Sequence, residues 1–244
     1  MNFVLIMTLL LGTQVSTEDK IKKLNPGVQH EIATMVSETL KVWMPKLGLT
    51  DENLILAIIY KESGFARTWK AGSSGEWGLL QVIPSDAHIQ RALLKYRCTK
   101  EEQKFKIDSW KLCRCIEDDC SYPNVGNLIG NKYVVTADKA AKFFRYSPRA
   151  GLIVGLMELK YWKRKYDSKL KAQYWTTFPS YLFKAEEKEL YKNWWTSVRK
   201  GLGENIWIVH HNYGGIIKQT HLARWYPRGV LSTYKKLCAM DDAC

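Results

Sequence analysis

One short run limits the fold more than any other part of the chain. It is the apolar stretch Leu54–Ile59, which lies within "NLILAIIYKES". Thr50 and Asp51 just before it are typical of a helix start, and Gly64 just after it is typical of a helix end. A helix that is apolar nearly all round has to be buried on every side. The sequence therefore predicts a mostly α fold in which other helices enclose this one.

Other segments show the apolar spacing of helices. We expect a helix to begin at Asn25-Pro26 and to end at Pro45, because proline suits the first helical position and stops a helix. Later helices are expected in 79–96 beyond Pro84, in 147–166 with Leu152, Leu156 and Leu159 on one face, and in 221–237. No repeat or low-complexity linker divides the chain, which predicts one domain over residues 17–244.

The first sixteen residues, which carry no charge, predict export. The apolar stretch Phe3–Leu11 has the length of a signal-peptide core and is too short to span a bilayer. Gly12 and Ser16 supply small residues for a cleavage site. We therefore expect residues 1–16 to be a signal peptide and the mature protein to be secreted or periplasmic, without stable membrane insertion. A buried N-terminal segment is the alternative.

The cysteines agree with export, because an even number of cysteines in an exported chain predicts disulfides. The six are Cys98, Cys113, Cys115, Cys120, Cys238 and Cys244. Four of them lie within 98–120, which predicts a disulfide-rich insertion at about 88–146. Zinc binding is the rival interpretation, but Cys113-Arg-Cys115 is tighter than the usual spacing of zinc ligands. We therefore expect no metal, and the pairing of the cysteines stays open.

The charge of the chain limits its partners. Lys and Arg number 37 against 24 Asp and Glu, a net charge of +13. Such a field favours an anionic partner, for example nucleic acid, an anionic membrane or an acidic cell-wall polymer. The sequence contains no glycine-rich phosphate loop, zinc-finger spacing or RNA-binding aromatic motif, so we do not expect nucleic acid.

Glu62 stands where the buried helix ends and the turn-rich "GSSGEWG" approaches. A carboxyl group in such a place loses solvation, which raises its pKa and leaves it protonated near neutral pH. Cleavage of a glycosidic bond needs such a proton donor. An ordinary exposed glutamate in a last helical turn is the alternative, and further motifs have to decide between the two.

Those motifs resemble the soluble lytic transglycosylases of bacterial cell-wall metabolism. "ESGF" and then "SSGEWGLLQVIPSDA" are similar to the family's Glu-Ser and Gly-Leu-Met-Gln segments, with Leu80 where Met is usual. "SPRAGLIVG" is similar to the motif Asp-Pro-x-x-Asn-Ile-x-x-Gly, with Gly151 in the Asn position. "HHNYGG" is similar to Tyr-Asn-Ala-Gly, with His211 in the Tyr position. The motifs occur in the family's order but cover a minor part of the chain, and 88–146 and 165–205 stand as insertions.

The resemblance implies a lysozyme-like fold with a groove for peptidoglycan glycan strands. It implies cleavage between N-acetylmuramic acid and N-acetylglucosamine by a monomer without a cofactor. Glu62 would protonate the leaving oxygen and then remove a proton from the muramic C6 hydroxyl, which closes a 1,6-anhydro ring. This scheme needs no second carboxylate, unlike the general pattern of glycosidases.

The resemblance also implies a set of substrate-binding residues. They are Ser63, Leu80, Gln81, His211, Asn212 and Tyr213. Each of the first three has a structural alternative: a helix hydroxyl, a core side chain and a turn amide, respectively. A protonated His211 would lower the pKa of Glu62, or else Tyr213 supplies the hydroxyl of the family's tyrosine. Trp77 is a further candidate, because aromatic faces stack on sugar rings.

Two other functions remain open on the same fold. Glu76 and Asp86 are candidates for a second carboxylate, which would make the enzyme a hydrolytic muramidase. The departures at Gly151 and His211 instead favour a catalytically silent wall-binding protein. Analysis of the cleavage products separates all three.

Overall fold

The computed structural model describes residues 15–66, 75–104, 136–165 and 220–241, the strands between 106 and 134, and residues 193, 196, 200 and 201. Side chains are described for these residues, except in the strands, at residue 165 and at residues 220–225. Within these parts the chain is mostly helical, as predicted. The helices are α1 (Thr17–Leu24), α2 (His30–Leu47), α3 (Glu52–Ser63), α4 (Ala87–Lys95), η1 (Glu102–Lys104), α5 (Ala137–Tyr146), α6 (Pro148–Lys165) and α9 (Thr220–Asp241).

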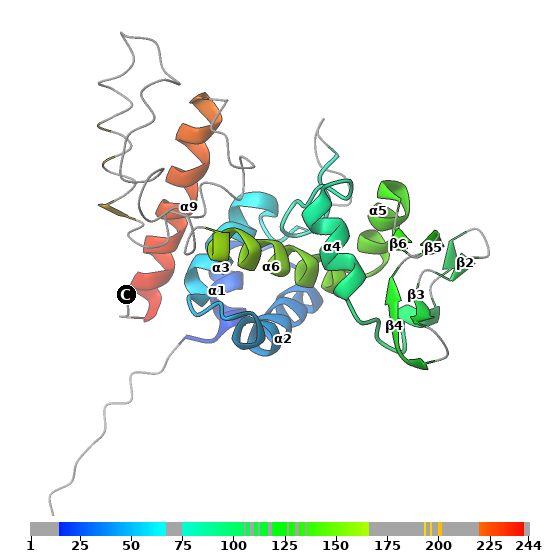
Figure 1. Ribbon diagram of the computed structural model, residues 1–244. Helices are drawn as coiled ribbons and strands as arrows, with labels where there is room; N and C mark the ends of the chain where they lie inside the picture. The colour runs from blue at the N-terminus through cyan, green and yellow to red at the C-terminus, as the bar shows by residue number, and fades with distance from the viewer. Residues whose placement is uncertain are drawn as a thin grey trace, which may run out of the picture.

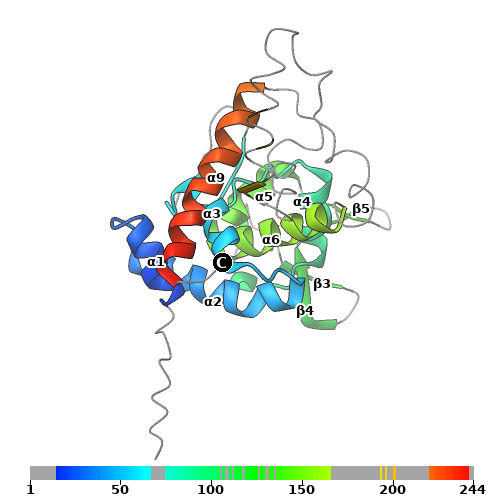
Figure 2. The ribbon, with the colours of Figure 1, turned by 90° about the vertical axis from the view of Figure 1, so that its left-hand side faces the viewer.

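Helix α3 is the apolar helix that the sequence predicted, and its bounds confirm the prediction. Every residue from Asn53 to Ile59 is buried. The Asp51 side chain accepts a hydrogen bond from the Leu54 backbone N–H at 2.9 Å and so caps the helix start. Gly64 ends the helix in the left-handed conformation, with φ 60°. Helix α9 lies along α3 in both views (Figures 1 and 2), and the Tyr234 hydroxyl of α9 donates to the Asp51 carboxylate at 2.8 Å.

Helix α2 differs from the prediction at both ends. Asn25 forms a turn instead of a helix start: its carbonyl accepts from the Val28 N–H at 3.1 Å and its side chain accepts from the Gly27 N–H at 3.0 Å. The helix therefore begins at His30. Pro45 lies inside the last turn and does not stop the helix. Its carbonyl still accepts a hydrogen bond, from Gly48 at 3.1 Å, and Gly48 provides the left-handed end with φ 67°.

Helix α6 is the second axis of the fold. Leu152, Leu156 and Leu159 are fully buried, as the apolar spacing predicted. Helices α2, α4 and α5 all pack against α6. The turn that carries Leu80 also approaches α6 closely at Gly155: a Cβ at this position would lie 2.7 Å from Leu80 Cδ1 and 2.8 Å from Leu80 Cβ. The turn that carries Leu80 can therefore press against α6 only because residue 155 has no side chain.

The segment 106–134 forms three antiparallel two-stranded sheets at the end of the molecule away from α9 (Figure 1). They pair β1 (Lys106–Ile107) with β2 (Trp110–Lys111), β3 (Cys113–Ile116) with β4 (Asp119–Val125), and β5 (Asn127–Ile129) with β6 (Lys132–Val134). The expected insertion at 88–146 thus contains these hairpins, with α4 before them and α5 after them. Cys98 and Cys238 are both in the disulfide form, and the pairing of the six cysteines lies outside the described residues.

A buried glutamate fastens the start of this segment to α6. Glu102 is 5% exposed. Its carboxylate accepts hydrogen bonds from the Tyr96 hydroxyl at 2.8 Å, the Thr99 N–H at 2.8 Å and the Ser147 hydroxyl at 2.5 Å. Ser147 immediately precedes α6, so one carboxylate joins chain segments that are distant in sequence. Its three donors compensate for the loss of water.

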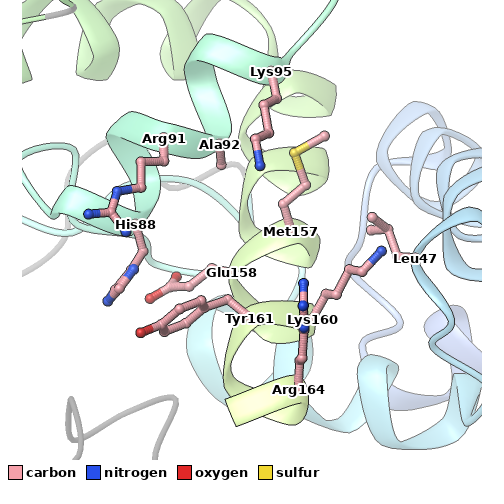
Figure 3. A pocket seen from close by; sticks show the side chains of 10 residues that line it. All are labelled: Leu47, His88, Arg91, Ala92, Lys95, Met157, Glu158, Lys160, Tyr161 and Arg164. Carbon is pink, nitrogen blue, oxygen red and sulfur yellow. The ribbon is translucent and has the colours of Figure 1, made fainter.

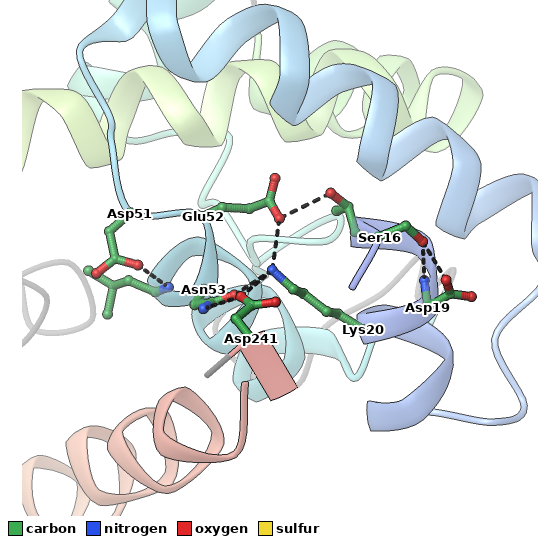
Figure 4. A network of polar contacts seen from close by, with 9 residues as sticks. Ser16, Asp19, Lys20, Asp51, Glu52, Asn53 and Asp241 are labelled. Carbon is green, nitrogen blue, oxygen red and sulfur yellow. Dashed lines mark hydrogen bonds and ion pairs between the residues drawn. The ribbon is translucent and has the colours of Figure 1, made fainter. Parts of the chain in front are cut away.

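A second buried network ties three helices together (Figure 4). Lys20 of α1 is 2% exposed, and its Nζ lies 2.6 Å from the Asp241 carboxylate of α9. The same Nζ donates to Asn53 of α3 at 3.1 Å, and the Asn53 amide donates to Asp241 at 3.0 Å. Burial acts to raise the pKa of Asp241, but the hydrogen bonds from Lys20 and Asn53 and the Lys20 charge lower it overall. The network therefore holds an ionised pair where α1, α3 and α9 meet.

Lys20→Met should destabilise the protein by about 3–5 kcal/mol, because removal of one partner leaves a buried charge uncompensated. Urea unfolding followed by circular dichroism measures the change. Lys22→Met, at an exposed position of the same helix, is the control and should cost less than about 0.5 kcal/mol. Equal effects of the two substitutions would show that the network contributes nothing specific.

The Gly155 contact gives a second prediction, with a matched control on the same helix. Gly155→Ala should destabilise the protein by about 1–3 kcal/mol, because the new methyl group overlaps Leu80. A Cβ at Gly151 would meet Phe144 at 3.5 Å, an ordinary contact. Gly151→Ala should therefore stabilise the protein, by up to about 1 kcal/mol, through the helix propensity of alanine. Thermal unfolding of the two variants measures both effects, and an equal change in both would contradict the role of Gly155.

Candidate active site

Glu62 lies in the last turn of α3, with its side chain partly buried. The chain then bends through two left-handed residues, Gly64 at φ 60° and Phe65 at φ 59°. A left-handed phenylalanine is uncommon and strained. It is held because the Phe65 ring is 1% exposed and because the Asn25 side chain donates to the Gly64 carbonyl at 2.6 Å. The position of Glu62 is thus fixed by the packing on both sides of this bend.

A tight turn over residues 77–82 is the second part of the site. Trp77 and Val82 close it with backbone hydrogen bonds of 2.8 and 3.0 Å. Gly78 is left-handed at φ 79°, and so is Gln81 at φ 47°. The Gln81 side-chain amide donates to the Gly78 carbonyl at 2.7 Å, inside the turn. Phe65 and Gln81 are the two left-handed residues other than glycine in the part of the chain that the structure describes. Strain of this kind gathers at functional sites.

Glu158 of α6 is the third part, and its carboxyl group is unusual. The residue is 9% exposed, and Trp162 one turn later donates to Oε1 at 3.4 Å. Burial raises the pKa of Glu158 from 4.5 to about 7, against the hydrogen bond from Trp162, which lowers it. The negative charges of Asp86 and Glu62 make smaller contributions to this rise. Carboxyl groups from α3 and from the start of α4 therefore act on the carboxyl group of α6.

An open cavity of about 370 Å³ lies between α4 and α6 and is bordered by Glu158 (Figure 3). Glu158 lines it together with His88 and Tyr161. The rings of His88 and Tyr161 are stacked with their centres 3.8 Å apart. Figure 3 shows the Glu158 carboxyl group beside the His88 ring and above the Tyr161 ring. Glu158 thus borders the cavity, and the charge of Glu62 raises its pKa.

The residues that were expected to bind substrate make the following contacts in the structure. The Ser63 hydroxyl donates to the Ile59 carbonyl at 3.1 Å, as a helix hydroxyl does. Leu80 is 1% exposed and packs on Gly155, as the alternative of a core side chain describes. Gln81 satisfies its own turn through the amide N–H. Trp77 is partly buried. His211, Asn212 and Tyr213 lie outside the described residues.

The two candidates for a second carboxylate also differ from each other. Asp86 caps α4, because its Oδ1 accepts from the His88 backbone N–H at 2.7 Å. It nevertheless acts on Glu158. Glu76 is partly buried just before the turn, and it is not one of the charges that act on Glu158.

Sequence reasoning missed Glu158. A signal was present, because this acid interrupts the apolar run of a helix that was expected to be buried, with Trp162 in hydrogen-bonding position one turn later. His88 was missed as well, since nothing in the sequence places it over Tyr161. Within the described residues no group of three or more His, Cys, Asp or Glu side chains is arranged to hold a metal ion. No helix among them is long and apolar enough to cross a bilayer.

Comparison of this chain with known protein families, with curated proteins and with solved structures gives no match.

The raised pKa of Glu158 predicts a specific dependence of stability on pH. The folded state binds this proton more tightly than the unfolded state does. The stabilisation is therefore complete below pH 4.5 and is lost as the pH rises through about 7. Each unit between the two pKa values corresponds to about 1.4 kcal/mol. The free energy of unfolding of Glu158→Gln, relative to that of the wild type, should therefore rise by about 3 kcal/mol between pH 4 and pH 8.

Urea unfolding of both proteins at each pH measures this difference. Glu38→Gln, at an exposed position of α2, controls for the loss of one negative charge. A difference between Glu158→Gln and wild type that does not change with pH would show that Glu158 is not held protonated.

Proposed function

We propose that this protein is an exported peptidoglycan lytic transglycosylase with a lysozyme-like fold, in which Glu62 is the catalytic acid. The observation that carries the proposal is the meeting of carboxyl groups at the end of α3: Glu62 is coupled to Glu158, whose pKa is raised to about 7. Groups whose surroundings separate their protonation states are typical of acid–base catalysis. The left-handed residues Phe65 and Gln81, which both follow Glu62 in the chain, add independent support.

The chemistry needs two proton transfers, and Glu62 carries out both of them. Glu62 donates a proton to the glycosidic oxygen as the bond to the muramic C1 breaks. Its carboxylate then takes the proton of the muramic C6 hydroxyl, and the C6 oxygen closes the 1,6-anhydro ring on C1. The proton from the C6 hydroxyl replaces the one that left with the product, so Glu62 ends the cycle protonated and no water is consumed. Glu158 and Glu62 disfavour each other's ionisation, so the pair holds on to a proton near neutral pH, and Glu62 acts as the acid when it carries that proton.

The structure also gives a reason to keep a hydrolytic muramidase as the second candidate. Hydrolysis requires a second carboxylate to activate water or to form a glycosyl intermediate. Glu158 is such a carboxylate, on a different helix from Glu62 and at the edge of an open cavity. It would serve as a base only when ionised, so hydrolysis should rise with pH through about 7.

Mass spectrometry of peptidoglycan digested with the mature protein tests the proposal. Products lighter by one water than hydrolytic products are expected from the wild type. Glu62→Gln should lower kcat/KM by at least about 10²-fold, because the general acid is lost. Glu76→Gln is the matched control, an acid in the neighbouring turn, and should leave the rate within about twofold of wild type.

The products distinguish the candidates. Reducing ends in place of anhydro ends, lost in both Glu62→Gln and Glu158→Gln, would establish the muramidase. Binding to the wall without any product would establish a silent wall-binding protein, and His211→Tyr is then the reversion to test. Full activity in Glu62→Gln would overturn the role of Glu62 as the acid in both enzymatic candidates.

A further inference from the structure

The cavity between α4 and α6 carries four cations that the proposed chemistry does not use. Arg91 and Lys95 lie one turn apart on α4, and Lys160 and Arg164 lie one turn apart on α6. All four side chains are exposed at the cavity. Figure 3 shows Lys95 and Arg164 extending toward its middle from opposite ends.

These charges are not neutralised by the rest of the described chain. The ion pairs found among the described side chains involve Lys20, His30, Lys104 and Lys142, and none involves the four cations of the cavity. Like charges one turn apart on a helix cost about 0.2–0.5 kcal/mol for each pair. The one acid in the lining, Glu158, is neutral below about pH 7 because of its burial. The arrangement therefore does not stabilise the fold, and it creates a local positive field at an open cavity.

The lining between the cations is apolar. Leu47 and Ala92 are buried, and Met157 is partly buried. A ligand that fits has anionic groups at its ends and apolar atoms between them. Two arginines provide the planar fork that binds carboxylates in pairs of hydrogen bonds. A volume of about 370 Å³ lies in the range of small-ligand sites and suits a few amino-acid residues.

We propose that this cavity binds a short acidic peptide through its carboxylates. The assignment rests on the proposed function, since peptidoglycan strands carry short peptides with free carboxylates. Glu158 links the two sites, because it lines the cavity and is coupled to Glu62. A glycan held at Glu62 would thus place an attached peptide at the cations, and the cavity would select strands that bear peptides over bare glycan.

Calorimetric titration with N-acetyl-Ala-Glu-Ala-Ala, which has two carboxylates, tests the site without any bond cleavage. Saturable binding is expected at low salt. The same peptide with Gln in place of Glu and an amidated C-terminus should bind at least tenfold more weakly. Equal binding of the two peptides would overturn the proposal. Binding of inorganic phosphate as tight as that of the acidic peptide would show a general anion site and would also overturn it.

Variants locate the site. Arg91→Gln with Lys160→Gln should weaken acidic-peptide binding at least about tenfold. Lys235→Gln with Lys236→Gln removes the same charge from an exposed part of α9 and should change binding less than twofold. Equal weakening by both pairs would assign the binding to the overall field of the protein and would overturn the site. Circular dichroism confirms that each variant is folded.

The failure of this inference differs from the failure of the proposed function. Peptide binding without cleavage of peptidoglycan would leave the cavity assigned and would sink the enzymatic proposal alone. Cleavage without peptide binding would sink the inference alone. If both hold, Arg91→Gln with Lys160→Gln should raise KM for peptide-bearing strands and leave KM for bare glycan strands unchanged.

Discussion

The complete enclosure of α3 is the constraint on which the rest of the structure depends. Because Asn53–Ile59 expose no face to water, the helix can exist only inside a shell of other helices. Its ends are then fixed by polar contacts instead of by solvent. Lys20 and Asp241 hold Asn53 at one end, and the left-handed Gly64 and Phe65 hold the other. Glu62 therefore has little freedom to move.

The parts of the fold that could be predicted from sequence are those set by local rules. The bounds of α3 follow from Asp51 and Gly64, and the buried face of α6 follows from the spacing of its leucines. The predicted start of α2 was wrong because the Asn25 side chain and carbonyl form the hydrogen bonds of a turn. Such a turn competes with a helix start at the same residue. The predicted end of α2 was wrong because Pro45 lies in the last turn, where its carbonyl still accepts a hydrogen bond from Gly48.

The candidate site was predictable in part, for a related reason. Glu62 is marked by its place at the end of an apolar helix, which is a local signal. Glu158 acts through burial and through charges on other elements, and a single sequence does not show which helices meet. The same limit explains Leu80 and Gln81. Each lies in a motif segment, but whether such a side chain faces substrate or the protein depends on the approach of α6, which Gly155 allows.

The position of Glu158 connects the fold to both proposals. A buried acid with a pKa near 7 costs stability at neutral pH, and a leucine or glutamine in its place would avoid that cost. The cations of the cavity carry a similar cost, since like charges face one another without partners among the described residues. Both features destabilise the fold where α6 lines the cavity. Local conflicts of this kind are typical of the parts of a protein that serve a ligand, because a bound anionic ligand relieves the repulsion among the cations and a proton relieves the burial of the acid.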